Sequence, residues 1–249
     1  MSDVLEKKIT YLKTTFGIDY MYFNDNFFYR VVNHLRRERV NVSKGIYKTW
    51  EDYFIKETNV LKNIPCICDK QELEKFERQM SAERLSELYD SNEGFKISKQ
   101  QLYSIHEYLF QDVYDWAGEI RSVSMGKQQT VFLEPEKIEI YLTTIFQEAN
   151  QEIDKIQNEF QFANFLSNLF YRLNYAHPFR EGNGRTIREF LRQLVNSIDF
   201  DFGSFELDYQ NMNPESLAFG LSCNVPMFIT SEFQKCLLKK PGKKMSLSI

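Results

Sequence analysis

Residues 159–198 read EFQFANFLSNLFYRLNYAHPFREGNGRTIREFLRQLVNSI. Two segments in this stretch carry apolar residues at helical spacing, which predicts two amphipathic helices that face a common core. The loop that joins them is short and rich in polar residues and glycine. The apolar positions are Phe162, Phe165, Leu166, Leu169 and Leu173 before the loop, and Ile187, Phe190, Leu191, Leu194, Val195 and Ile198 after it.

The composition of the whole chain favours a mainly α fold. At 249 residues the chain is long enough to bury a full core. Its 43% hydrophobic and 27% charged residues are values of a globular protein, which argues against a disordered or membrane protein. With 22 Phe and 14 Tyr against 10 Gly and 6 Pro, helices around an aromatic interior are favoured over a turn-rich β fold.

Charge and cysteine usage exclude several classes of function. A net charge of −4, from 31 basic and 35 acidic residues, argues against nucleic-acid binding. The basic stretches 34–39 and 239–244 are interpreted as a solvated helix face and a frayed terminus. No apolar run is long enough to span a membrane and the first residues lack the apolar region of a signal peptide, so we expect a soluble, cytoplasmic protein. Cysteines 66, 68, 223 and 236 lack zinc or disulfide spacing and are expected to be reduced, buried thiols.

Three regions are expected along the chain: an N-terminal helical region at 1–95, a core at 96–200 and a C-terminal helical extension at 201–249. Capping boxes open helices near 70 and 99, the second continuing to Trp116, and prolines fit the first turns of two later helices. The residues concerned are Asp69 with Glu72, Ser98 with Gln101, Pro135 and Pro214. His106 and His34 are interpreted as structural side chains.

A β-hairpin is predicted between the helices of the core. Residues 119–135 read EIRSVSMGKQQTVFLEP, in which β-branched and apolar residues flank Gly126 to Gln129. A lone hairpin exposes an edge that can pair with another chain. A hairpin with no function beyond the fold is an equal alternative from this stretch alone.

The loop at 177–188, HPFREGNGRTIR, has the composition of a phosphate site. Free N–H groups and a partial positive charge at a helix start suit phosphate oxygens, and glycines allow the backbone to approach a ligand. Arg185 and Arg188 lie three residues apart on the first helical turn, and arginine matches phosphate geometry. Glu181 can join nucleotide phosphates in binding Mg²⁺, and the imidazole of His177 can serve as general base.

The same twelve residues resemble a known family. HPFREGNGRTIR matches every fixed position of the Fic-domain signature, H-x-F-x-(D/E)-G-N-G-R-x-x-R, and the similarity extends over most of 65–200. The resemblance implies a helical bundle with one β-hairpin flap beside the active-site loop. It also implies a protein adenylyltransferase, which transfers AMP from ATP to a Tyr, Thr or Ser hydroxyl of a target protein and releases pyrophosphate.

The resemblance assigns roles position by position. His177 would deprotonate the target hydroxyl, and Glu181 would hold Mg²⁺. The backbone from Gly182 to Gly184, with Asn183, would cradle the α-phosphate, and Arg185 and Arg188 would hold the β- and γ-phosphates. The flap would register the target segment by strand addition, through Ser122, Val123, Ser124, Met125, Gly126, Lys127, Thr130, Val131 and Phe132.

Regulation and donor choice stay open at this point. The Doc branch, which phosphorylates, carries Lys where this chain has Gly184, so adenylylation is favoured. The inhibitory pattern (S/T)-x-x-x-E-(G/N) is matched only in part, at Thr130 with Glu134 and Thr144 with Glu148. A small antitoxin-like inhibitor in trans, as in toxin–antitoxin pairs, or another mode of regulation is expected. Alternatives are another donor (a different nucleotide or phosphocholine), removal of AMP, or a non-catalytic nucleotide- or peptide-binding module, and delivery into another cell stays open.

Overall fold

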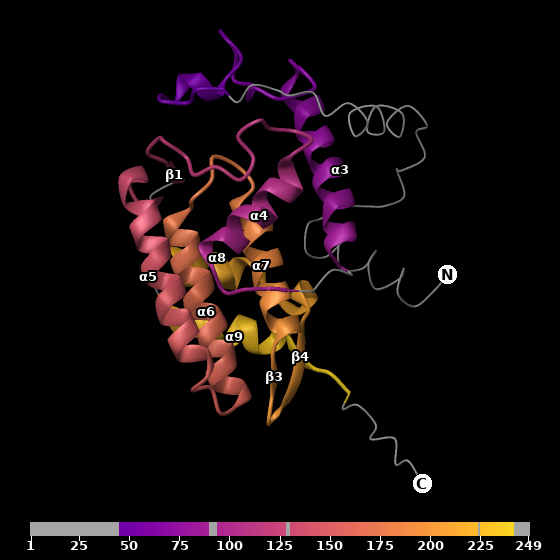
Figure 1. Ribbon diagram of the computed structural model, residues 1–249, viewed down its shortest axis with the longest axis vertical. Coiled ribbons are helices and arrows are strands. Elements are labelled where there is room, and N and C mark those ends of the chain that lie inside the picture. Colours follow the sequence, from indigo (N-terminus) through magenta and orange to yellow (C-terminus); the bar gives the residue numbers. More distant parts are fainter. Residues whose placement is uncertain (1–44, 90–93, 128–129, 224, 242–249) are drawn as a thin grey trace, which may run out of the picture.

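The computed structural model describes residues 45–89, 94–127, 130–223 and 225–241, and within these ranges helices dominate (Figure 1). Helix α7 lies at the centre and packs against α4, α6 and β4. Helix α6 also packs against α5 and α9. The helices are α3 (Lys70–Tyr89), α4 (Lys99–Phe110), α5 (Pro135–Ile153), α6 (Glu159–Ala176), α7 (Asn183–Ser197), α8 (Pro214–Ser222) and α9 (Pro226–Cys236), with 3-10 turns at Glu51–Tyr53 and Tyr209–Asn211.

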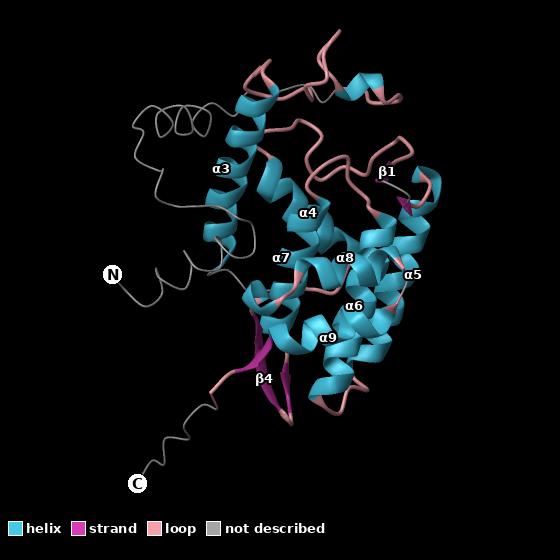
Figure 2. Cartoon of the chain, turned by 180° about the vertical axis from the view of Figure 1, so that it is seen from behind, coloured by secondary structure: helices cyan, strands magenta, loops and turns pink. Residues whose placement is uncertain are grey.

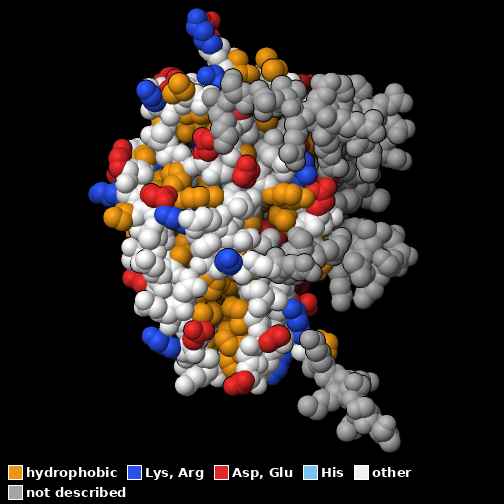
Figure 3. Space-filling model, viewed as in Figure 1, with side chains coloured by type: hydrophobic (Ala, Val, Ile, Leu, Met, Phe, Trp, Pro, Cys, Tyr) orange, Lys and Arg blue, Asp and Glu red, His pale blue; other side chains and the backbone are white. Residues whose placement is uncertain are grey.

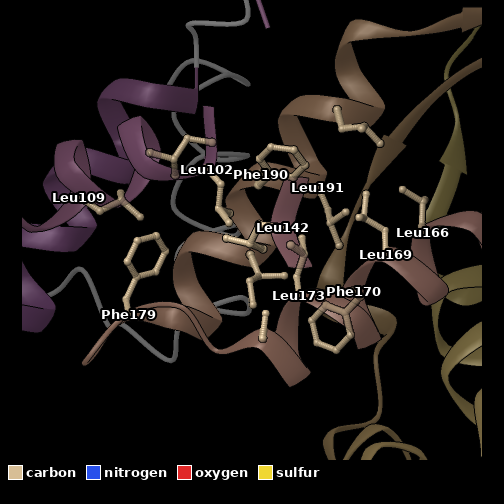
Figure 4. Close-up of a cluster of buried hydrophobic side chains, with 14 of the residues drawn as sticks. Leu102, Leu109, Leu142, Leu166, Leu169, Phe170, Leu173, Phe179, Phe190 and Leu191 are labelled. Carbon is tan, nitrogen blue, oxygen red and sulfur yellow. The ribbon is translucent and has the colours of Figure 1, made fainter. Parts of the chain in front are cut away.

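The apolar faces predicted for α6 and α7 meet in the core (Figure 4). Phe190 and Leu191 of α7 are fully buried, as are Leu142 of α5 and Leu173 of α6. Burial of each such side chain stabilises the fold by roughly 1.5–3 kcal/mol. Phe179, from the loop between α6 and α7, is also fully buried, so the core itself anchors the loop that carries the motif.

The predicted helix starts are confirmed by their caps. The Asp69 carboxylate accepts a hydrogen bond from the Glu72 N–H at 2.9 Å. The Ser98 hydroxyl accepts one from the Gln101 N–H at 3.2 Å. Pro135 and Pro214 occupy the first turns of α5 and α8, where the N–H that proline lacks has no helical acceptor.

The helix predicted from Ser98 to Trp116 is too long. Helix α4 ends at Phe110, and tight turns follow through Gly118. Val113 and Trp116 are buried as the apolar stripe predicted, but they reach the core from these turns.

The strands of the described residues form two small antiparallel sheets. The predicted hairpin is present, with Gly126 opposite Val131 and Lys127 opposite Thr130. A second sheet, in the order β3-β4-β5, was not predicted; it lies at the far end of the bundle from the hairpin (Figure 2). The strands are β1 (Gly126–Lys127), β2 (Thr130–Val131), β3 (Asp199–Phe200), β4 (Gly203–Leu207) and β5 (Leu237–Lys239).

Other predictions have mixed outcomes. Of the four cysteines, all free, only Cys236 is buried; Cys66, Cys68 and Cys223 are exposed because they lie in surface loops or at a helix end, so the prediction of burial is wrong for these three. His34 and the basic stretch at 34–39 lie outside the described residues. No helix in the described ranges is long and apolar enough to cross a membrane. Basic and acidic side chains are interspersed over the described part of the face in Figure 3.

Candidate active site

The motif loop begins where α6 ends. His177 caps α6 in the left-handed region, with φ 41°, and its N–H bonds to the Leu173 carbonyl at 3.0 Å. The Asn183 side chain then closes the loop, because it accepts from the Phe179 N–H at 2.9 Å and donates to the Phe179 carbonyl at 2.7 Å. Both ends of the Asn183 amide are therefore bonded within the loop.

Gly182 makes the turn into α7 and has to be glycine. Its φ is +79°, which L side chains rarely adopt. An added Cβ would also lie 2.3 Å from the Phe110 ring. The first backbone N–H bonded inside the turn is that of Thr186, to the Gly182 carbonyl at 3.1 Å. The preceding N–H groups at the start of α7 are therefore available to a ligand, as the sequence predicts.

The buried Arg121 side chain connects the motif loop to the flap. It is 1% exposed, and its guanidinium donates to the carbonyls of His177 at 2.7 Å and Val123 at 2.5 Å. It donates further to the Leu133 carbonyl and, at 3.3 Å, to that of Ala176. One buried cation thus fixes the end of α6 and both ends of the hairpin relative to one another.

His106 fixes the backbone at Glu181. The Gly118 N–H donates to His106 Nδ1 at 2.8 Å, so the proton of the neutral ring lies on Nε2 and is donated to the Glu181 carbonyl at 3.0 Å. The ring stacks on Phe179 at 3.8 Å. Burial lowers the pKa of His106 to about 3, so the ring is neutral at physiological pH. The structural interpretation of His106 is confirmed.

The imidazole of His177 packs on the flap. Its ring stacks on Phe132 with centroids 3.7 Å apart and planes 5° from parallel. Nδ1 lies 3.3 Å from the Asn174 carbonyl. A proton on Nδ1 would be donated to that carbonyl, which places the basic lone pair on Nε2.

Arg185 is held by α3. Its guanidinium forms an ion pair with Glu77 and donates to the Ser81 hydroxyl at 2.8 Å. Tyr114 donates to the other oxygen of Glu77, which is 8% exposed. The Arg185 guanidinium also lies 4.7 Å above the Phe110 ring. Arg185 therefore occupies a fixed, largely buried position on the α3 side of the loop.

Arg188 and Arg185 line two adjoining cavities with Glu181. The larger, about 710 Å³, also contains His177, and the smaller, about 580 Å³, lies toward α3. The larger cavity has the size of a small-molecule site. Gly184 lies at its wall, where an added Cβ would be 3.5 Å from the Arg188 guanidinium, an ordinary contact. The cavity thus gathers all the predicted catalytic, phosphate-binding and metal-binding residues: His177, Glu181, Gly182, Asn183, Gly184, Arg185 and Arg188.

The flap residues divide between cavity and scaffold. Met125, Gly126 and Phe132 line the larger cavity. Ser122 bonds to the Tyr47 carbonyl at 2.5 Å, and Ser124 bonds to Glu134 at 2.6 Å. The remaining predicted positions are Val123, which is buried, Val131, which is 67% exposed, and Lys127 and Thr130, which pair in the hairpin.

Several residues of the site were not predicted. Arg121 and Glu77 have no local pattern that marks them, since their partners are distant in the sequence. Asn174, Ala218, Leu221 and Ser222 also line the larger cavity, the last three from α8.

A family model for the Fic/DOC family matches residues 96–195. Over 161 residues, the chain is 35% identical to the "Probable protein adenylyltransferase y4lH" of Sinorhizobium fredii, which covers 64% of this chain and 79% of that protein. The chain belongs to the Fic/DOC family. The predicted resemblance is thereby confirmed.

Other relatives and solved structures agree with this assignment. The protein adenylyltransferase VbhT of Bartonella schoenbuchensis is 33% identical over 67% of this chain, which spans 35% of VbhT. An N-terminal Fic domain of a Bep effector from Bartonella quintana, solved with bound ADP, superimposes with a TM-score of 0.67 at 21% identity, over 76% of this chain and 96% of that one. BepC of Bartonella tribocorum, solved with bound AMPPNP, also superimposes with a TM-score of 0.67. The two chains are 20% identical, and the match covers 77% of this chain and 98% of BepC. The predicted mainly α fold with one hairpin flap is confirmed.

Proposed function

We propose that this Fic protein is an ATP-dependent protein adenylyltransferase, which transfers AMP to a hydroxyl side chain of a target protein. One observation carries the proposal: the His177 imidazole, the start of α7 and Arg188 line one cavity beside the hairpin. Relatives at 28–35% identity bear the name protein adenylyltransferase, in agreement with the predicted activity.

His177 acts as the general base. With its Nδ1 proton directed at the Asn174 carbonyl, Nε2 accepts the proton of the target Tyr, Thr or Ser hydroxyl. The hydroxyl oxygen forms a bond to the α-phosphorus of ATP as the bond from that phosphorus to pyrophosphate breaks. Stacking on Phe132 and the Arg121 contact to its carbonyl hold the ring in place for this transfer.

The start of α7 binds the phosphates. The free N–H groups of Asn183 and Gly184 face the α-phosphate, where negative charge develops in the transition state. Arg188 and Arg185 hold the β- and γ-phosphates and stabilise the leaving pyrophosphate. Arg185 does so from the position set by Glu77 and Ser81.

Glu181 is suited to bind Mg²⁺ only when the nucleotide phosphates supply further ligands. Its carboxylate is exposed to the cavity and accepts a hydrogen bond from the Gly182 N–H at 3.1 Å. No cluster of three or more metal-binding side chains occurs among the described residues, so the other ligands would be phosphate oxygens and water, as Mg²⁺ prefers. Bound there, the ion would neutralise phosphate charge.

The target segment binds along the hairpin. Strand β2 has an exposed Val131, and its neighbour Phe132 contacts His177. An extended segment that pairs with the flap would place its hydroxyl side chain at the imidazole.

Inhibition is assigned to a separate, antitoxin-like protein that binds in trans. The two partial inhibitory patterns in the chain are occupied elsewhere, since Glu148 pairs with Arg172 at 2.6 Å and Glu134 accepts from Ser124 at 2.6 Å. A cytoplasmic site of action is a prediction from the sequence; the Bep proteins of the two solved structures are named VirB-translocated effectors.

The test uses purified protein, Mg²⁺ and ATP labelled at the α-phosphate, incubated with cell lysate. We expect label on a protein band, and none with His177→Ala. Label from γ-labelled ATP alone would assign phosphorylation and contradict the proposal. Equal α-label with His177→Ala would contradict the role of His177.

A further inference from the structure

Arg180, at the variable position of the motif between Phe179 and Glu181, is a buried cation that forms no ion pair with a described residue. Only 7% of its surface is exposed. Its Nε has no hydrogen-bond acceptor among the described residues, and no ion pair or hydrogen bond of its side chain occurs there. Leaving a buried N–H donor such as Nε without an acceptor costs about 1–3 kcal/mol.

The other buried arginines of the described chain show what is unusual about Arg180. Arg121 donates to four carbonyls. Arg192 forms two hydrogen bonds to the Glu189 carboxylate, at 2.8 and 2.7 Å. Of the three buried arginines of the described residues, Arg180 is thus the one whose side chain has no hydrogen bond or ion pair with them.

An aromatic wall orients the Arg180 guanidinium. Its central carbon lies 4.0 Å from the ring centroid of Trp50, 5.2 Å from that of Phe54 and 5.7 Å from that of Tyr53. Such contacts stabilise a cation but accept none of its in-plane hydrogen bonds. Trp50 is 41% exposed, so this wall is open to solvent at its outer side.

Arg180 shares a cavity with His177 and the flap. It lines the larger cavity, together with His177 and Met125. It is not part of the smaller cavity toward α3, which Arg185 and Arg188 also line. The adjacent carboxylate, Glu181, bonds to the Gly182 N–H and does not bond to Arg180.

We propose that Arg180 and Trp50 form an anion-binding subsite for the target protein, which binds an acidic side chain close to the modified hydroxyl. The inference rests on the proposed adenylyl transfer. A carboxylate matches the planar fork of arginine, and the cavity that Arg180 lines gives it access to the guanidinium. The nucleotide phosphates have the start of α7 and Arg188 instead.

The first experiment separates the two sources of an anion. Affinity for AMPPNP with Mg²⁺ is measured by calorimetry for the wild type, Arg180→Gln and Arg188→Gln. We expect Arg180→Gln to bind within about twofold of the wild type and Arg188→Gln to bind at least about tenfold more weakly. A tenfold loss in Arg180→Gln would assign Arg180 to the phosphates and overturn the proposal.

The second experiment uses the lysate protein that accepts α-label, with its modified hydroxyl mapped. We expect an Asp or Glu near that hydroxyl, and KM for this protein raised roughly tenfold by Arg180→Gln while KM for ATP changes little. The Arg180→Glu variant should not transfer AMP to the natural target. It should transfer AMP again when the acidic residue near the modified hydroxyl of the target is changed to Lys. Absence of an acidic neighbour, or no rescue by the charge exchange, would overturn the subsite.

Two controls distinguish recognition from folding and from the proposed function. Because Arg180 has no polar partner to lose among the described residues, Arg180→Gln should change the melting temperature by less than about 4 °C. A larger fall would make Arg180 a structural residue and contradict the proposal. If the wild type itself transfers no label while AMPPNP binds, adenylyl transfer fails, and the subsite built on it fails with it.

Discussion

His106 makes the stability of this protein depend on pH in a way that one substitution can isolate. The ring is fully buried, accepts from the Gly118 N–H and donates to the Glu181 carbonyl. A second proton would convert Nδ1 from acceptor to donor and bury a charge. Both effects oppose protonation, and the pKa of His106 in the folded protein is lowered to about 3.

The size of the effect follows from linkage. In the unfolded chain the pKa of a histidine is about 6.5. Between pH 6.5 and 3 the unfolded chain therefore binds a proton that the folded chain does not, and the free energy of unfolding falls as the pH falls. The loss approaches about 1.4 kcal/mol per pH unit, or about 2.7 kcal/mol at pH 4.5. Above pH 6.5 this contribution is present in full.

The assay is denaturant unfolding of the wild type and His106→Gln at pH 7.0 and pH 4.5. Glutamine does not titrate, and carboxylates common to both proteins cancel in the comparison. The wild type should lose about 2.7 kcal/mol more than the variant between the two pH values, although the variant is less stable at pH 7.0. Equal losses in the two proteins would refute a neutral, buried His106.

Three further predictions concern the loop supports. Arg121→Lys should lower the free energy of unfolding by about 2–4 kcal/mol in denaturant titration, because one ammonium cannot reach four carbonyls. Gly182→Ala should cost about 2–4 kcal/mol by the same measurement, and Gly184→Ala, at ordinary φ and with ordinary contacts, less than about 1 kcal/mol. Glu77→Gln should weaken AMPPNP binding roughly tenfold in calorimetry and leave AMP binding unchanged, because Glu77 acts by positioning Arg185. Adding Arg185→Gln should then cause no further loss of AMPPNP affinity, whereas additive losses would show that Glu77 acts independently of Arg185.

The sequence predicts those parts of the fold that depend on local chemistry. Caps at Asp69 and Ser98 and the apolar faces of α6 and α7 involve residues within one or two turns of each other. The predicted end of α4 is wrong, and the reason is also local. Turns after Phe110 are closed by bonds such as Val113 N–H to Phe110 carbonyl at 2.9 Å, so apolar residues keep nearly helical spacing without a helix.

The second sheet was not predictable in the same way. Strand β4 pairs with β5 through Phe205 opposite Lys239 and Leu207 opposite Leu237. These partners lie about thirty residues apart, with α8 and α9 between them. Neither strand shows in its own residues which segment will pair with it.

In the candidate site, too, residues in a contiguous motif could be predicted and residues that depend on distant contacts could not. The seven predicted site residues of the motif were named because twelve contiguous positions carry the signature. Their supports were not, because Arg121 bonds to a residue 56 positions away, His106 to one 75 away and Glu77 to one 108 away.

These three supports explain how a surface loop can keep its chemistry in place. Each comes from a segment that precedes the motif, and each is buried, so the loop positions they hold are set before any ligand arrives. Such preorganisation requires that every buried donor be matched by an acceptor within the protein, as is true of Arg121 and His106. Arg180 breaks that rule in the middle of the same loop. Because Arg180 lines the cavity beside His177, an acidic group of the bound target would supply the acceptor that the described residues lack.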